Sequence, residues 1–272
     1  MRLALGTLPG EPDGNEDFAA AVPGAAVLLD GAGVAEAETG CVHGVAWFAG
    51  TLGALLLRTV TARPARSLAD CLAGALSEVR SQHEGSCDLT SRASPTSTVV
   101  AVRVADGQLQ YLVLGDSTLL RAGPDGAPVA VTDRRLDEVG RGLRGPLDAL
   151  PTGSPEHAAA LADYRDALTR LRNRPGGFWI AGPDPHAAEH ALTGTVPLDA
   201  LASVTLLSDG ATRLVDRFGV AGWGQVLDTL NRSGPDELIR QVREAEAEDP
   251  EGRRWPRDKA HDDATVLHWV LP

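Results

Sequence analysis

The amino-acid sequence predicts an α+β fold built on antiparallel sheets. Strand-like and helix-like segments occur in separate groups and do not alternate, which is typical of this class. Four short apolar runs also follow one another between residues 98 and 132, joined by turns rich in Gly and Asp, which predicts an antiparallel meander. The 272 residues are 43% hydrophobic and contain no repeat or Pro/Ser linker. We therefore expect a single domain over residues 1–272.

The first part of the chain supplies one strand and two helices. Residues 25–29 form a short apolar run, which predicts a buried strand. Residues 42–61 are apolar but interrupted by glycines, so we expect a buried helix and no membrane span. Apolar side chains recur at helical spacing over residues 67–82, and Ser67 is a suitable N-cap.

The remaining elements follow in the same way from apolar runs and turn residues. After the meander, residues 133–175 form a Gly-, Arg- and Pro-rich excursion, irregular as far as residue 155 and helical over 155–173. Its Arg141 and Arg144 are candidate anion contacts. The later elements are expected as strands over 177–181, 204–208 and 265–271 and helices over 223–230 and 235–247.

Charge and cysteine usage exclude several classes of partner. A net charge of −12 argues against a nucleic-acid backbone as partner. The three cysteines, Cys41, Cys71 and Cys87, lack any C-x-x-C spacing, so neither a disulfide framework nor a structural zinc site is expected. A lone histidine is more often packed or solvated than a ligand, and His43 is interpreted in this way. We expect a cytoplasmic protein with no membrane partner.

Four aspartates adjoin predicted strands. Asp30, Asp116 and Asp209 each follow an apolar run, and Asp262 lies just before the last one. Carboxylates held rigidly at strand ends can assemble a site for a hard cation such as Mg²⁺ or Mn²⁺. Taken singly, an Asp-Gly pair after a strand is a turn signal, and Asp106 is interpreted as one.

The acidic motifs also occur in a recognisable order. They are Asn15-Glu16-Asp17, Asp30-Gly31-Ala32-Gly33, Gly115-Asp116-Ser117, Ser208-Asp209-Gly210 and Asp262-Asp263-Ala264-Thr265. That order resembles the metal-dependent (PPM, type 2C) serine/threonine protein phosphatases, and the resemblance covers nearly the whole chain. It implies two antiparallel β-sheets sandwiched between layers of helices, with a two-metal site at one rim.

The resemblance implies a ligand set for two Mn²⁺ or Mg²⁺ ions. Asp30 would bridge both ions. Asp209 and Asp262 would complete the protein ligands of one ion, and Glu16 with the backbone carbonyl of Gly31 would serve the other.

The implied reaction is hydrolysis of phosphoserine or phosphothreonine in a phosphorylated protein substrate. A water bridging the two ions would attack phosphorus, with Asp17 orienting metal-bound water and Asp30 holding both ions. No phosphoenzyme is needed, in agreement with the absence of a nucleophilic Cys or Ser motif.

Two positions depart from the family pattern. Where the family usually has a phosphate-binding Arg, this chain has Pro12. A third metal would use Asp116, but its second acidic ligand is replaced by Arg213. Arg213 is either a surface arginine on a short helix over 211–218 or a substitute phosphate clamp.

Two alternatives to a protein phosphatase remain open. Pro12 favours a catalytically weak or inactive PPM-fold module that acts by protein–protein contact. A phosphatase for a small phosphorylated metabolite is the other, with residues 133–175 as a flap that shapes its pocket.

Overall fold

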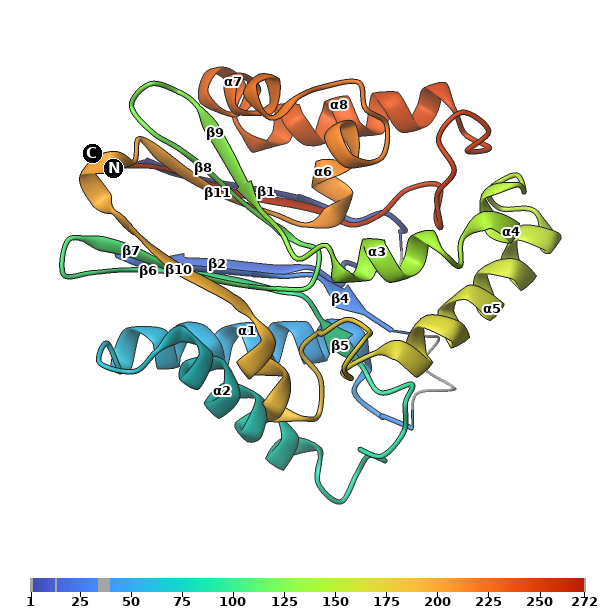
Figure 1. Cartoon of the computed structure of the whole chain (residues 1–272), viewed down its shortest axis with the longest axis horizontal. Helices are drawn as coiled ribbons and strands as arrows, with labels where there is room; N and C mark the ends of the chain where they lie inside the picture. Colours follow the sequence, from blue (N-terminus) through green and yellow to red (C-terminus); the bar gives the residue numbers. More distant parts are fainter. Residues whose placement is uncertain (1, 13, 34–39, 272) are drawn as a thin grey trace.

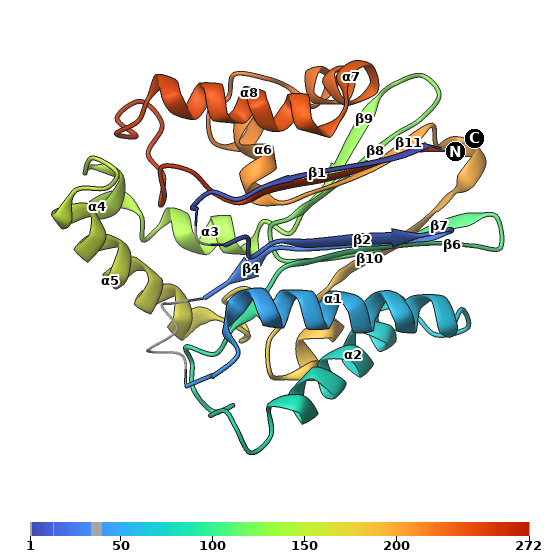
Figure 2. The same ribbon diagram turned by 180° about the vertical axis from the view of Figure 1, so that it is seen from behind.

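Two five-stranded antiparallel sheets lie face to face, and helices cover the outer face of each sheet (Figure 1). The computed structural model describes residues 2–12, 14–33 and 40–271. The view from behind shows the same layers, with α1 and α2 below one sheet and α7 and α8 above the other (Figure 2). The predicted α+β class and the sandwich architecture are confirmed.

The first sheet has the C-terminal strand near its centre. The side chains of this strand, β12, are buried on both faces as far as Trp269, because one face meets the second sheet and the other meets helices. Three helices cover the outer face: α6 (Asp209–Asp216), α7 (Trp223–Ser233) and α8 (Pro235–Glu248). In spatial order the strands are β1 (Arg2–Leu8), β12 (Ala264–Val270), β11 (Ser203–Leu207), β8 (Thr118–Ala122) and β9 (Pro128–Val131).

The second sheet is covered by the two N-terminal helices, α1 (Gly44–Ala62) and α2 (Leu68–His83). Ser67 caps α2 as predicted, since its hydroxyl accepts the Asp70 N–H. In spatial order the strands are β10 (Leu192–Pro197), β7 (Gln108–Leu114), β6 (Val99–Ala105), β3 (Ala25–Leu29) and β2 (Phe18–Val22).

Four short elements complete the fold. They are the paired two-residue strands β4 (Gly31–Ala32) and β5 (Thr96–Ser97) and the 3₁₀ helices η2 (Pro185–His190) and η3 (Leu198–Ala200).

Helix α1 is long and apolar enough to cross a membrane by length and composition alone. In the fold it has a different use. Phe48, Leu52 and Leu56 are almost fully buried in the cluster that joins α1, α2 and the second sheet. This agrees with the expectation of a buried core helix.

The predicted four-stranded meander is wrong. Strands β6 and β7 form a hairpin in the second sheet, whereas β8 and β9 form a hairpin in the first. The chain crosses between the sheets at residues 115–117, where Gly115 adopts φ +86°. Apolar runs look alike in either sheet, so their pattern cannot reveal the crossing. The crossing places Asp116 at the rim of the sandwich.

The excursion is also more regular than predicted. It contains α3 (Arg135–Arg141) and α4 (Gly145–Asp148) before α5 (Pro155–Leu171). Arg144 is held by Asp148 and Asp258 and lies over the Tyr164 ring, so it has a structural role. Residues 177–181 form isolated bridges and no strand. Sequence reasoning missed β1, β2 and β10, which are edge strands with no continuous buried apolar run.

One buried histidine ties fold stability to pH. His268 of β12 is hydrogen-bonded to Thr205 of β11, with 2.8 Å between Nδ1 and Oγ1. Its other ring nitrogen, Nε2, lies 3.3 Å from Asn231 Oδ1. Burial, reinforced by the charge of Arg2, lowers the pKa of His268 to about 4. As pH falls, His268 is protonated in the unfolded chain before it is protonated in the folded protein. The stabilisation that comes from burying neutral His268 is therefore complete above about pH 6.5 and is lost as pH falls towards 4.

We predict that His268→Gln removes this loss. Between pH 7 and pH 4, the unfolding free energy of the native sequence should fall more than that of the variant. The difference between the two falls should be about 3 kcal/mol at most. Urea unfolding at several pH values measures the difference directly. A difference that stays constant with pH would contradict the assignment.

Candidate active site

The predicted acidic residues come together at one rim of the sandwich. Asp30 directly follows β3, and Asp209 begins α6 with only Ser208 between it and the end of β11. Asp262 lies just before β12, and Asp116 lies in the crossing between the sheets. The segment before β2 brings Glu16 and Asp17 to the same place, because the Gly31 N–H donates to the Glu16 carbonyl at 3.2 Å.

Electrostatics shows how close these carboxylates are. Burial raises the pKa of Asp30 well above its ordinary value, and repulsion from Asp17, Asp209, Asp262 and Asp116 raises it further. Burial also raises the pKa of Asp209, followed by repulsion from Asp262. Ionising all of them together is unfavourable unless positive charge is supplied.

Asp17 lacks the partners that buried carboxylate oxygens normally have, and Asp116 lies in an equally unfavourable place for a negative charge. Neither carboxylate oxygen of Asp17 has a hydrogen-bond partner with regular geometry. Burial raises the pKa of Asp17 to about 7, although the nearby hydroxyls of Thr265 and Ser208 act to lower it. Burial and repulsion from Asp209 raise the pKa of Asp116 to about 8. Buried, unsatisfied carboxylate oxygens are suitable ligands for a hard divalent cation, so the residues fit Mn²⁺ or Mg²⁺.

Asp262 is in a different electrostatic position. Its Oδ2 accepts from Arg213 at 2.9 Å, and its Oδ1 accepts from Lys259 at 3.1 Å. Burial alone would raise the pKa of Asp262, but these two cations outweigh it and lower the pKa. Lys259 also interacts with Glu16 and Asp209, so one ammonium group lies among three predicted metal ligands. It is the only lysine in the chain.

The expected surface position of Arg213 is wrong. Its side chain is buried, because α6 lies beneath α8 and directs the guanidinium toward Glu246. Nη1 lies 2.5 Å from Glu246 Oε1, while Nη2 bonds Asp262. The phosphate-clamp role remains a prediction, and the pairing with two carboxylates does not favour it.

Sequence reasoning overlooked the role of Asp263. Its Oδ1 accepts the Gly10 N–H at 2.8 Å, and its Oδ2 accepts the Glu16 N–H at 2.7 Å. One carboxylate thus fixes the N-terminal segment that carries Glu16 and Asp17. The paired Asp262-Asp263 was the available signal, but only the first residue was assigned a function.

Two motif glycines allow close backbone contact. A Cβ atom at Gly31 would lie 2.7 Å from the Glu16 carbonyl oxygen, and one at Gly210 would lie 2.0 Å from the Asp263 carbonyl oxygen. Both distances are below normal contact, so larger residues would separate the segments that carry the carboxylates.

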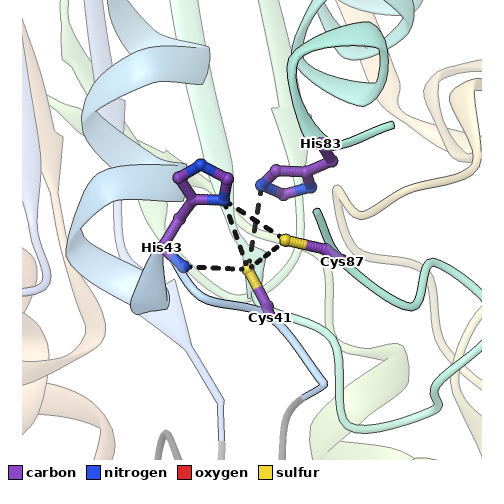
Figure 3. A group of neighbouring side chains, drawn as sticks. All are labelled: Cys41, His43, His83 and Cys87. Carbon is purple, nitrogen blue, oxygen red and sulfur yellow. Dashed lines mark hydrogen bonds between the residues drawn. The ribbon is translucent and has the colours of Figure 1, made fainter. Parts of the chain in front are cut away.

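A second group of metal-ligating side chains lies elsewhere, at the ends of α1 and α2. Ligand atoms of Cys41, His43, His83 and Cys87 all lie within 4.8 Å of one another (Figure 3). The expectation of no structural zinc site, drawn from the odd number of cysteines and the lack of C-x-x-C spacing, did not foresee this cluster. The available signal was a Cys-x-His pair and a His-x₃-Cys pair.

Solved structures of serine/threonine phosphatases share this fold. MsPP from Mycobacterium smegmatis, in complex with cacodylate, is 18% identical with a TM-score of 0.57, covering 100% of this chain and 99% of that one. The catalytic domain of PstP, in complex with two manganese ions, is 18% identical with a TM-score of 0.56, and the match covers 100% of this chain and 98% of the PstP chain. PppA, a regulatory component of T6SS in Pseudomonas aeruginosa, is 20% identical with a TM-score of 0.54, covering 98% and 96%.

No protein-family profile matches the chain, and no curated protein matches its sequence. The structural likeness therefore establishes the fold, which is that of the PPM phosphatases.

We predict that Asp30→Asn stabilises the metal-free protein. At pH 8 the unfolded chain ionises Asp30 freely, whereas burial and repulsion oppose its ionisation in the native cluster. The melting temperature in EDTA should rise by several degrees, at roughly 2–4 °C per kcal/mol. Excess Mn²⁺ should stabilise the native sequence more than the variant. Asp106→Asn, in an exposed hairpin turn, is the control. An unchanged or lower melting temperature in EDTA would contradict the prediction.

Proposed function

We propose that this chain, which has the PPM phosphatase fold, is a metal-dependent phosphatase that hydrolyses phosphoserine or phosphothreonine in cytoplasmic proteins. The observation that carries the proposal is the convergence of partly buried, mutually repelling carboxylates from five separate segments on one rim. The PstP structure with two manganese ions supports the metal requirement, and the phosphatase neighbours support a phosphoprotein substrate.

In this proposal Asp30, Asp209 and Asp262 would hold one Mn²⁺ or Mg²⁺ ion, while Asp30, Glu16 and the Gly31 carbonyl would hold a second. When bound, such ions supply positive charge for a phosphate group and make coordinated water more acidic. The carboxylates themselves would keep bound cations beside the rigid strand ends.

Asp17, Asp263 and helix α3 would position water, the Glu16 ligand and the substrate. Asp17 has two buried oxygens without regular partners, so it can accept a hydrogen bond from water and hold that water in one orientation. Asp263 fixes Glu16 through its backbone N–H. Helix α3 belongs beside the rim, because Asp137 is close enough to Asp116 to raise its pKa. The excursion that contains α3 is thus well placed to contact a substrate.

We predict that Asp209→Asn abolishes activity. Removing one anionic ligand should lower Mn²⁺-dependent hydrolysis of p-nitrophenyl phosphate and of a phosphothreonine peptide at least about 100-fold, as expected for loss of a central electrostatic contribution. Circular dichroism should show an intact fold. Asp106→Asn applies the same change to an Asp-Gly turn and should retain activity. Equal activity in both variants would reject the proposed site.

A panel of phosphopeptides and phosphorylated metabolites then separates the substrate classes. Faster turnover of peptides supports a protein phosphatase. Preference for a metabolite would reassign the substrate and leave the metal-dependent chemistry in place.

A non-catalytic module acting by protein contact is the second candidate. The observation that favours it is Lys259, whose ammonium neutralises charge among Glu16, Asp209 and Asp262. Arg213 adds a second positive charge beside Asp262. Pro12 offers no side-chain donor where the family usually has an arginine. A rim neutralised by its own side chains could persist without metal.

We predict that Lys259→Met strengthens Mn²⁺ binding. The substitution removes a competing cation while keeping most of the side-chain length, so affinity should rise about tenfold or more. Calorimetric titration of both proteins measures the change. An enzyme should bind Mn²⁺ in its native sequence. A module should bind it only after the substitution. An affinity that does not rise would show that Lys259 does not compete with the cation.

A further inference from the structure

Four donor atoms converge where the loop before α1 meets the end of α2. Cys41 and His43 come from the loop and N-cap of α1, His83 is the last residue of α2, and Cys87 follows four residues later (Figure 3). The separations are 3.5 Å between Cys41 Sγ and Cys87 Sγ, 3.3 Å between Cys87 Sγ and His43 Nδ1, 3.8 Å between Cys41 Sγ and His43 Nδ1, and 3.9 Å between Cys41 Sγ and His83 Nε2.

These distances match the edges of a zinc tetrahedron. With Zn–S bonds of about 2.3 Å and Zn–N bonds of about 2.0–2.1 Å, tetrahedral angles separate two sulfurs by about 3.8 Å and a sulfur from a nitrogen by about 3.6 Å. Four of the six edges lie within a few tenths of an ångström of those values, and the other two, from His83 to His43 and to Cys87, are at most 4.8 Å. A disulfide instead requires the sulfurs to approach to about 2.05 Å.

The surroundings hold the donors in place. Cys41 and His83 are buried, while His43 and Cys87 are partly exposed. The Trp47 ring stacks against both imidazoles, with ring centroids 4.1 Å from His43 and 4.8 Å from His83. The backbone N–H of His43 donates to Cys41 Sγ at 3.4 Å, a contact that supports a thiolate ligand.

We infer that Cys41, His43, His83 and Cys87 bind one Zn²⁺ ion in a structural site. Two sulfur and two imidazole ligands are a set that suits zinc. Two thiolates balance the charge of the ion, which makes the partly buried position favourable. The protein supplies all four ligands, so the tetrahedron is closed and no position remains for a substrate. The oxygen ligands at the carboxylate rim suit harder cations instead.

The zinc site would also support the loop that follows Asp30. Val45 lies two residues after His43 and packs against Gly31 and Gly33, where an added Cβ would meet its methyl groups at 2.6 and 2.5 Å. On the other side, the Asp88 N–H donates to the Gly40 carbonyl at 2.9 Å. An ion bound here fixes the start of α1 against that loop and joins it to the end of α2.

Metal content and cobalt spectroscopy of the 272-residue chain test the inference. Protein purified under reducing conditions with zinc should contain about one zinc per chain, measured by elemental mass spectrometry, and retain it in Asp209→Asn. Replacement by Co²⁺ should give a thiolate charge-transfer band and tetrahedral ligand-field bands. Cys41→Ser and Cys87→Ser should each lose the band and most of the zinc. Cys71→Ala is the matched control, because Cys71 is buried in α2 outside the cluster.

A second measurement covers variants that do not fold. In the native sequence, bound zinc should protect Cys41 and Cys87 from alkylation, and chelation should expose both and lower the melting temperature. Three results would each overturn the inference: zinc that is absent under these conditions, zinc that is lost in Asp209→Asn but kept in Cys87→Ser, or a Cys41–Cys87 disulfide in the reduced, zinc-supplied protein.

Discussion

Repulsion among partly buried carboxylates at one rim is the constraint on which the rest of the site depends. Burial and mutual repulsion both oppose ionisation of Asp30, Asp116 and Asp209. Only a rigid scaffold can hold such groups together, because a flexible one would relax by moving them apart. The stacked sheets provide that rigidity, since each carboxylate is attached to a strand end or to a segment bonded to one.

The backbone near the rim is arranged so that these segments approach closely. Asp263 binds two N–H groups of the N-terminal segment, and the glycines at positions 31 and 210 allow backbone contacts that a side chain would block. The crossing at Gly115 carries Asp116 from one sheet to the other. Each of these features lies in a motif that also contains a carboxylate, which explains why the motifs are short and local in sequence.

Four of the acidic motifs were predictable from sequence because each one is local: a short apolar run next to an aspartate. The motif with Glu16 and Asp17 followed only from the order of motifs in the resemblance. The fold class followed from the grouping of strands and helices. Features that depend on contacts between distant segments were not predictable. Arg213 is buried only because α8 covers α6, and the Cys41–Cys87 proximity depends on packing between two helices. Likewise, the apolar pattern of β6 to β9 does not reveal which sheet each hairpin joins.

The position of Lys259 has a practical consequence for chemical labelling. It is the only lysine in the chain, and its side chain is 39% exposed. An amine-directed reagent therefore has a single side-chain target, and that target lies among the carboxylates of the rim. Because a protonated amine reacts slowly, the labelling rate at Lys259 reports the charge of its neighbours. Covalent attachment at this one position would give a fluorescent or spin probe placed directly beside Asp262.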